Sequence, residues 1–291
     1  MALPTTAVIN FSDVDDRDVQ KAIRAVNRQI QEDFVPLWGQ GRELRLHASR
    51  VDPTSPNVNL EEESVAADSV LYLVTESTLP GALGYHDMNT SEAAVGFIFT
   101  GAGDWTITLS HEALELTLDP TVNIFVPGPD PEAPTDPNRW LWHAYEACDA
   151  VERMSYQVDG VLVSDFVTSN YFRPGNAPGT RNDFLGVGVP SFGVMPGCHL
   201  GVVDPVTYDF RIIFGKEAAQ NRLQQDRRRL YDHPKPSRPD DDRLVKVLLS
   251  VKETVQKLPS YRKGSGVDLL NGITRTGRYR ARAATLKSTK R

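Results

Sequence analysis

The stretch from Trp105 to Pro120 reads WTITLSHEALELTLDP, and the predictions of fold and function start from it. Its apolar residues recur at helical spacing, and it ends at an Asp-Pro pair, which stops a helix. His111 and Glu115 are four residues apart, so on a helix they share one face about one turn apart. The sequence therefore predicts a helix over 105–118 that carries a histidine and a carboxylate side by side.

The same helix carries the residue types of a metal site. Two ligands at positions i and i+4 can bind one metal ion, and Glu112 next to His111 can reach a water on that ion. This is the logic of H-E-x-x-H, with Glu115 in place of the second histidine. The other residues are mostly apolar, and a buried helix must satisfy its charged groups, which a metal does directly. The alternative is a surface helix with two glutamates and a capping histidine.

The segments before this helix predict a mixed sheet. The segment 16–38 has apolar residues at helical spacing, and Ser12 with Asp15 resembles a helix N-cap box. Four apolar or alternating runs read as strands, at 6–11, 44–51, 69–75 and 94–100. The order strand, helix, strand, strand, strand, helix predicts an α/β (α+β) fold, in which helices pack on a twisted mixed sheet.

The segments after the helix are more irregular. Residues 121–139 form a proline-rich loop that could rim a cleft, and 173–200 are rich in glycine and proline. We expect 140–152 to be partly helical, 156–172 to form a β-hairpin turning at Asp159-Gly160, and 209–214 to be a strand. The predicted domains are a main domain over 1–215, a helical extension over 216–260 and a basic flexible tail over 261–291.

The charge distribution is uneven. The net charge is −6, but from Arg262 onward nine lysines and arginines face one acid, a charge of +8 that leaves −14 for the rest. Such a tail could contact nucleic acid, acidic lipids or an acidic partner, or could be a solubilising extension. No apolar run is long enough for a membrane span. No signal peptide is visible at the N-terminus, which favours a cytoplasmic location.

Other classes of site lack their sequence signatures. The chain has no phosphate-binding glycine loop, no CxxC pair and no nucleophile elbow. Its two cysteines, Cys148 and Cys198, could be two buried thiols or one bridge.

The segment SHEALELTLDP, followed by a long loop and by YEACD at 145–149, resembles bacterial zincin-like proteins. These have a Ser-His-Glu-x-x-Glu…Asp-Pro helix and a later Glu-x-x-Asp or Glu-x-Cys-Asp element. The order of elements up to residue 118 also resembles the N-terminal subdomain of metzincin zinc peptidases. The resemblance covers residues 6–200. It implies a metzincin-like sheet with a long N-terminal helix and an active-site helix, and a metal-dependent peptidase acting on peptides or proteins.

The chain departs from the metzincin pattern H-E-x-x-H-x-x-G-x-x-H. Positions 115, 118 and 121 hold Glu, Leu and Thr, so the third ligand must come from elsewhere. Glu146 is the first choice, because gluzincin-like peptidases take this ligand from a later helix, with Asp149 as its partner. Asp119 and Asp149 are the alternatives. Met195, in a Gly/Pro turn, resembles the methionine that metzincins place beneath the metal.

Several further side chains are weaker candidates. Three of them could stabilise an oxyanion if they reach the site, namely Tyr156, Tyr171 and His199. The remaining possible ligands are His47, His86 and His143. A metal with two carboxylate ligands should acidify its bound water less than a metal with one. Two carboxylates also suit Ca²⁺ or Mn²⁺, although the imidazole favours zinc.

Two functions follow from these features. The first is a zinc metallopeptidase-like hydrolase, in which Glu112 activates a water on a metal held by His111, Glu115 and a downstream acid. The second is a catalytically inactive zincin-fold protein that works as a structural, assembly or interaction module. Glu115 and the missing third metzincin ligand favour the second, whereas Glu112 beside His111 favours the first.

Overall fold

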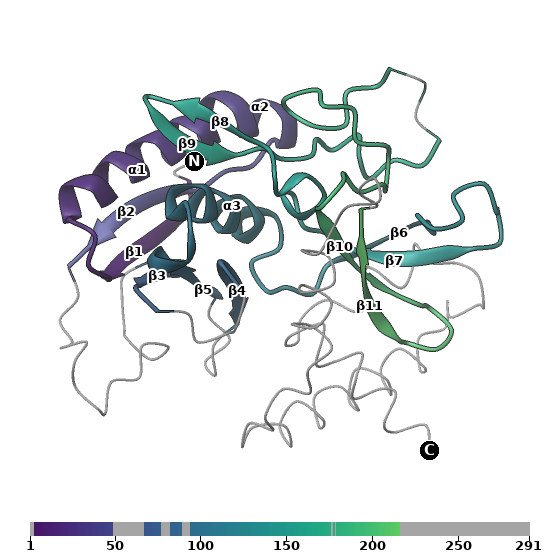
Figure 1. Cartoon of the computed structure of the whole chain (residues 1–291), viewed down its shortest axis with the longest axis horizontal. Coiled ribbons are helices and arrows are strands. Elements are labelled where there is room, and N and C mark those ends of the chain that lie inside the picture. The colour runs from purple at the N-terminus through teal and green to yellow at the C-terminus, as the bar shows by residue number, and fades with distance from the viewer. Residues whose placement is uncertain are drawn as a thin grey trace, which may run out of the picture.

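The computed structural model describes residues 3–48, 67–76, 82–88, 94–175, 177 and 179–215. Its N-terminal part is built on a five-stranded sheet with the strand order β2-β1-β3-β5-β4 (Figure 1). The strands are β1 (Thr5–Phe11), β2 (Glu43–His47), β3 (Ser69–Val74), β4 (Gly84–Met88) and β5 (Ala94–Phe99). The edge strand β4 is antiparallel to β5, and the other neighbours are parallel. At this coarse level the mixed α/β fold is as predicted.

The central strands are apolar on both faces. Successive residues of a strand point to opposite sides of a sheet. Val8 and Leu71 therefore belong to the main core beneath the helices, whereas Ile9 and Tyr72 pack in a second apolar cluster on the other face. This double burial explains why the strands read as dense apolar runs.

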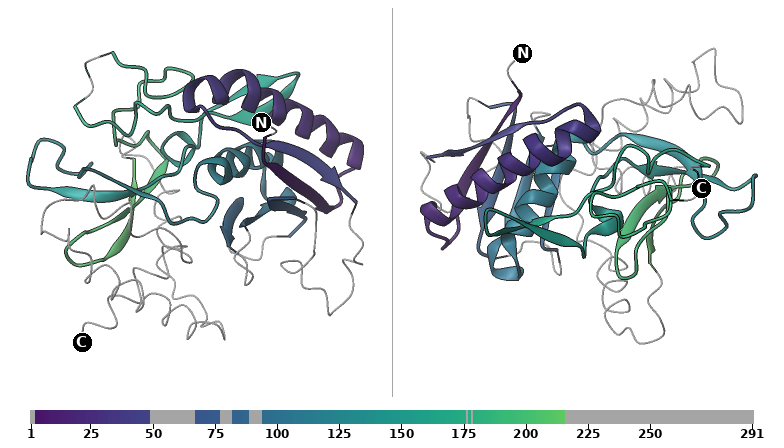
Figure 2. Two further views of the ribbon diagram at one scale, coloured as in Figure 1. Left: turned by 180° about the vertical axis from the view of Figure 1, so that it is seen from behind. Right: turned by 90° about the horizontal axis from the view of Figure 1, so that it is seen from above.

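The helices α1 and α3 lie together on one face of this sheet (Figure 2). α1 (Asp16–Gln29) continues through the π-helical turn η1 (Ile30–Phe34) into α2 (Val35–Trp38), so the helix predicted over 16–38 is confirmed. Its N-cap is Asp15, whose side chain accepts the N–H of Arg17, whereas the Ser12 hydroxyl donates to Asn10. A short 3-10 turn η3 (Thr100–Ala102) precedes α3 (Trp105–Leu118), which confirms the predicted bounds 105–118.

The C-terminal part adds a second sheet and a hairpin. The sheet has the order β11-β10-β7-β6, formed by β6 (Phe125–Pro129), β7 (Trp140–Ala144), β10 (His199–Val203) and β11 (Phe210–Phe214). The hairpin consists of β8 (Ser155–Val158) and β9 (Val161–Ser164), which turn at Asp159-Gly160 and pack beside α1 and α3 (Figure 1). The predicted turn and the strand over 209–214 are confirmed, although the hairpin ends before 172.

The prediction of a partly helical segment over 140–152 is wrong. Trp140–Ala144 is strand β7, and only Asp149–Val151 forms a short 3-10 turn, η4. β7 pairs with β6, which lies inside the proline-rich segment predicted as a loop. β6 is the edge strand of its sheet. Pro127 and Pro129 have no backbone N–H to donate, and an edge strand tolerates this because one of its sides has no partner strand. Strands β4 and β10 were also not predicted.

The predicted helical extension over 216–260 and the basic tail over 261–291 lie outside the described residues. Within the described ranges, no helix has both the length and the apolar character needed to cross a membrane.

Candidate metal centre

The helix α3 is held in register by buried polar contacts next to the motif. The Ser110 hydroxyl donates to Gln29 Oε1 on α1 at 2.8 Å and accepts the backbone N–H of Ser164 on β9 at 2.9 Å. Gln29 Nε2 in turn donates to the Ser164 carbonyl at 2.8 Å. Because all three residues are fully buried, misplacing the helix would leave polar groups unsatisfied. This contact fixes the direction in which the next residue, His111, projects.

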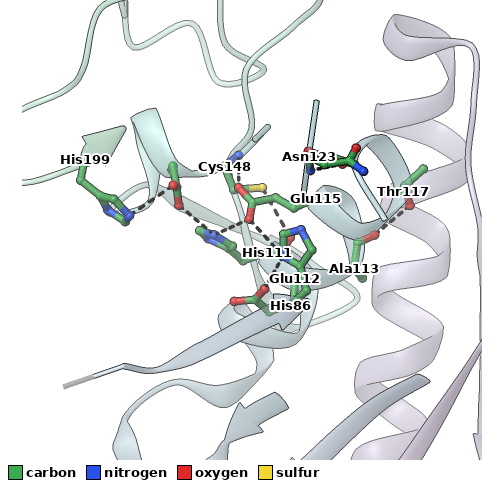
Figure 3. A network of polar contacts seen from close by, with 11 residues as sticks. His86, His111, Glu112, Ala113, Glu115, Thr117, Asn123, Cys148 and His199 are labelled. Carbon is green, nitrogen blue, oxygen red and sulfur yellow. Dashed lines mark hydrogen bonds and ion pairs between the residues drawn. The ribbon is translucent and has the colours of Figure 1, made fainter. Parts of the chain in front are cut away.

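His111 faces two carboxylates that come from different parts of the chain (Figure 3). Its Nε2 lies 3.2 Å from Glu115 Oε2, one turn along the helix, and 3.4 Å from Asp149 Oδ1 in η4. One ligand atom from each of these three residues lies within 4.8 Å of the others. The second oxygen of Glu115 accepts the backbone N–H of Cys148 at 3.0 Å, which holds η4 against α3.

Glu112 belongs to a second group, together with Glu115 and His86. His86 is on the edge strand β4, and its Nδ1 lies 3.0 Å from Glu112 Oε2 and 3.8 Å from Glu115 Oε2. A Cβ on Gly84 would lie 3.0 Å from Glu112 Oε1, 2.5 Å from the Thr108 side chain and 2.8 Å from the Phe97 carbonyl. A glycine at position 84 is therefore what lets β4 approach the glutamate.

His199 extends the site on the far side of Asp149. Its Nε2 lies 3.2 Å from Asp149 Oδ2, and its Nδ1 lies 3.2 Å from Glu152 Oε1. Each ring nitrogen thus faces a carboxylate. Figure 3 shows His199 and His111 on opposite sides of one carboxylate.

Burial and charge oppose each other in this site. Burial alone would lower the pKa of His86, but the hydrogen bond and charge of Glu112 raise it to about 9. For His111 and His199, too, burial is outweighed by the neighbouring acids, which raise the pKa well above its usual value. Burial would raise the pKa of Asp149, but His199 and His111 hold it well below the usual range. The site is a compact, alternating set of acids and imidazoles.

Among the predicted third ligands, the structure brings the alternative Asp149 to His111. Glu146 is buried, but it is in neither ligand group found among the described residues. The reason is local: residues 145–148 are not helical and only a short 3-10 turn starts at Asp149, so the spacing expected from a later helix does not apply. Asp119 is the C-cap residue of α3, and its carboxylate accepts the backbone N–H groups of Asn123 and Ile124 in the turn that follows.

Met195 lies in a loop that packs against the turn carrying Asp149. Its backbone N–H donates to the Ala150 carbonyl at 3.0 Å, and its side chain packs on the cluster that includes Val151. The loop thus packs against η4.

The predicted oxyanion candidates have other partners. The Tyr156 hydroxyl donates to Asp33, and the Tyr171 hydroxyl donates to the Gly193 carbonyl. Both ring nitrogens of His199 face acids, as described above. His47 is on β2, at the opposite edge of the sheet from β4.

The two cysteines, which the sequence left as thiols or a bridge, are both buried free thiols in the described part of the chain.

His143 is packed in the second sheet and lies outside both groups. Its Nε2 lies 3.0 Å from the Pro129 carbonyl, and its ring contacts Phe192. Burial lowers its pKa to about 4. Because the unfolded chain then binds a proton that the folded state excludes, stability falls as the pH drops from about 6.5 to 4.

We expect His143→Phe to reduce this acid sensitivity. When the pH falls from 7.5 to 4.5, the unfolding free energy of the variant should fall by roughly 2–3 kcal/mol less than that of the wild type. Urea unfolding at both pH values measures this shift. A difference that stays constant with pH would show that the pKa of His143 is the same in the folded and unfolded protein, and that burial does not lower it.

No family model matches the chain, and no curated protein matches it.

Proposed function

We propose that this chain is a metal-dependent, peptidase-like hydrolase whose metal is held by His111, Glu115 and Asp149. The observation that supports it is the convergence of these three residues, with one ligand atom from each lying within 4.8 Å of the others. One imidazole nitrogen and two carboxylate oxygens fit zinc, and the acids also suit Mn²⁺ or Ca²⁺. The resemblance to zincin-like proteins and the neighbouring Glu112 support hydrolysis as the reaction.

The buried acids also support a cation at this place. Glu115 and Asp149 are 2% and 7% exposed, and within the described ranges the ion pairs that they make are with histidines. Buried carboxylates need a partner of opposite charge. A divalent ion would meet this need and would leave His111 neutral, as a ligand must be.

Glu112 is the proposed general base. When bound, the metal would supply a Lewis acid that acidifies water and polarises the scissile carbonyl. Glu112 follows His111 directly on α3, takes the proton of the attacking water and passes it to the leaving amine. His86 Nδ1 holds Oε2 of this glutamate at 3.0 Å, and the missing side chain at Gly84 leaves room beside Oε1. The base is thus fixed in place before a substrate arrives.

The alternative is an inactive module with the same fold, and one contact favours it. His86 Nδ1 already engages Oε2 of Glu112 at 3.0 Å, so this oxygen is not free to accept a proton from water. Two acidic ligands also leave the metal less able to acidify water. In this function the cation would hold α3 and η4 together and would carry out no chemistry.

The test is the metal content of the purified full chain, measured by mass spectrometry. We expect about one zinc per chain in the wild type and in His47→Ala, and a loss of zinc in His111→Ala. His47 is the matched control because it is a histidine on β2, at the edge of the five-stranded sheet opposite β4. A wild-type chain that takes up no metal, even after incubation with zinc, would show that the proposed function is wrong.

A further inference from the structure

His199 and Glu152 form a pair beside Asp149. We propose that His199, held by Glu152, is a positioning residue that turns Asp149 so that Oδ1 faces His111 while Oδ2 stays engaged. This inference rests on the proposed function, because it assigns to Asp149 the role of a metal ligand. With this role for His199, the second sheet becomes part of the metal centre, since β10 supplies the residue that orients Asp149.

The two oxygens of Asp149 are divided between two histidines. Oδ1 lies 3.4 Å from His111 Nε2, and Oδ2 lies 3.2 Å from His199 Nε2. A carboxylate with one oxygen so engaged presents the other oxygen alone to an ion. Without His199, Oδ2 would be a buried acceptor that has lost its main donor, and the side chain could rotate to use either oxygen.

His199 is placed to orient this ligand and not to bind the ion itself. The ligand group at His111 contains Glu115 and Asp149 but not His199, whose donor atom is not within 4.8 Å of all the others. Its Nδ1 is directed to Glu152 Oε1 at 3.2 Å, so the ring is held from both sides. Partners of this kind fix the orientation and basicity of a metal ligand.

The backbone at His199 is held by strand pairing. β10 pairs with β11 through His199 and Phe214, and the two rings lie 6.2 Å apart. At its other end β10 pairs with β7 through Val202 and Val203. A side chain held by a central strand keeps its geometry better than one on a loop.

The experiment compares zinc affinities, measured by competition with a chelator, for the full chain and four variants. We expect His199→Phe, which keeps a ring but loses both donors, to weaken zinc binding by about 10–100-fold. His199→Gln keeps one donor toward Asp149 and should recover much of this loss. Glu152→Gln should weaken binding by about 3–10-fold, because it loosens the ring without removing it.

The matched control is His143→Phe. His143 is a buried histidine of β7, in the same sheet, and has its own hydrogen bond to Pro129. Its zinc affinity should stay within about threefold of wild type, since it touches no ligand. Circular dichroism of the metal-free variants identifies any that fail to fold. If His199→Phe does not fold, Glu152→Gln tests the positioning role in its place, because its side chain is 15% exposed and its replacement disturbs the core less.

The outcomes separate this inference from the proposed function. If the wild type binds zinc and His199→Phe binds it as tightly as the control, the positioning role is wrong and the proposed function stands. If His199→Phe loses zinc as fully as His111→Ala and glutamine recovers nothing, His199 is itself a ligand and the positioning role is again wrong. If His199→Phe does not fold and Glu152→Gln binds zinc as tightly as the wild type, the positioning role is also wrong. If the wild type binds no zinc, both proposals fail together.

Discussion

Glu112→Gln is expected to lower kcat for peptide hydrolysis by about 10²–10⁴-fold while leaving the zinc content unchanged. Glutamine has the shape of glutamate and can still accept from His86 Nδ1, but it cannot take a proton from water. The metal ligands proposed above do not include this side chain, so the ion should remain. Kinetics on a fluorogenic peptide library, with zinc measured on the same samples, checks both parts.

The control for this variant is Glu43→Gln. Glu43 is on β2, where it pairs with Arg45 at the surface, so removing its charge should change neither kcat nor zinc content. A Glu112→Gln protein that cleaves peptides as fast as the wild type, with its zinc in place, would exclude Glu112 as the base. A wild-type protein that binds zinc and cleaves no peptide would leave the inactive module as the better function.

Asp149→Asn is expected to weaken zinc binding by at least about 100-fold, beyond the 10–100-fold typical of partners outside the ligand set. The amide keeps the size of the side chain but removes the charge that faces His111 at 3.4 Å. Chelator competition measures the loss. It should be larger than the effect of His199→Phe, because a ligand contributes more than the residue that orients it.

Two matched variants decide which acid is the third ligand. Glu146→Gln should leave zinc affinity within about threefold of wild type, because Glu146 lies in neither ligand group of the described residues. Asp119→Asn should reduce stability by about 1–3 kcal/mol, since its carboxylate accepts two backbone N–H groups, and should leave zinc affinity unchanged. If Glu146→Gln loses zinc and Asp149→Asn keeps it, the metal has the ligand set first expected from the sequence.

Local patterns account for the parts of the fold that could be predicted. The spacing of apolar residues predicted α1 and α3, because a helix repeats every 3.6 residues whatever surrounds it. The dense runs of β1, β3 and β5 were predicted because both faces of these strands are buried. β4, with the sequence GYHDM, has no such run, since it is an edge strand that pairs with β5 alone.

In the candidate site, too, some contacts follow from local sequence and others depend on how the chain packs. The sequence by itself determined that His111 and Glu115 lie side by side, because residues at i and i+4 of a helix share one face by backbone geometry alone. Only the tertiary structure decided that Asp149 faces His111, that His86 holds Glu112 and that His199 stands behind Asp149. These contacts join β4, α3, η4 and β10, and their distances depend on how two sheets and a helix pack. No spacing along the chain contains that information.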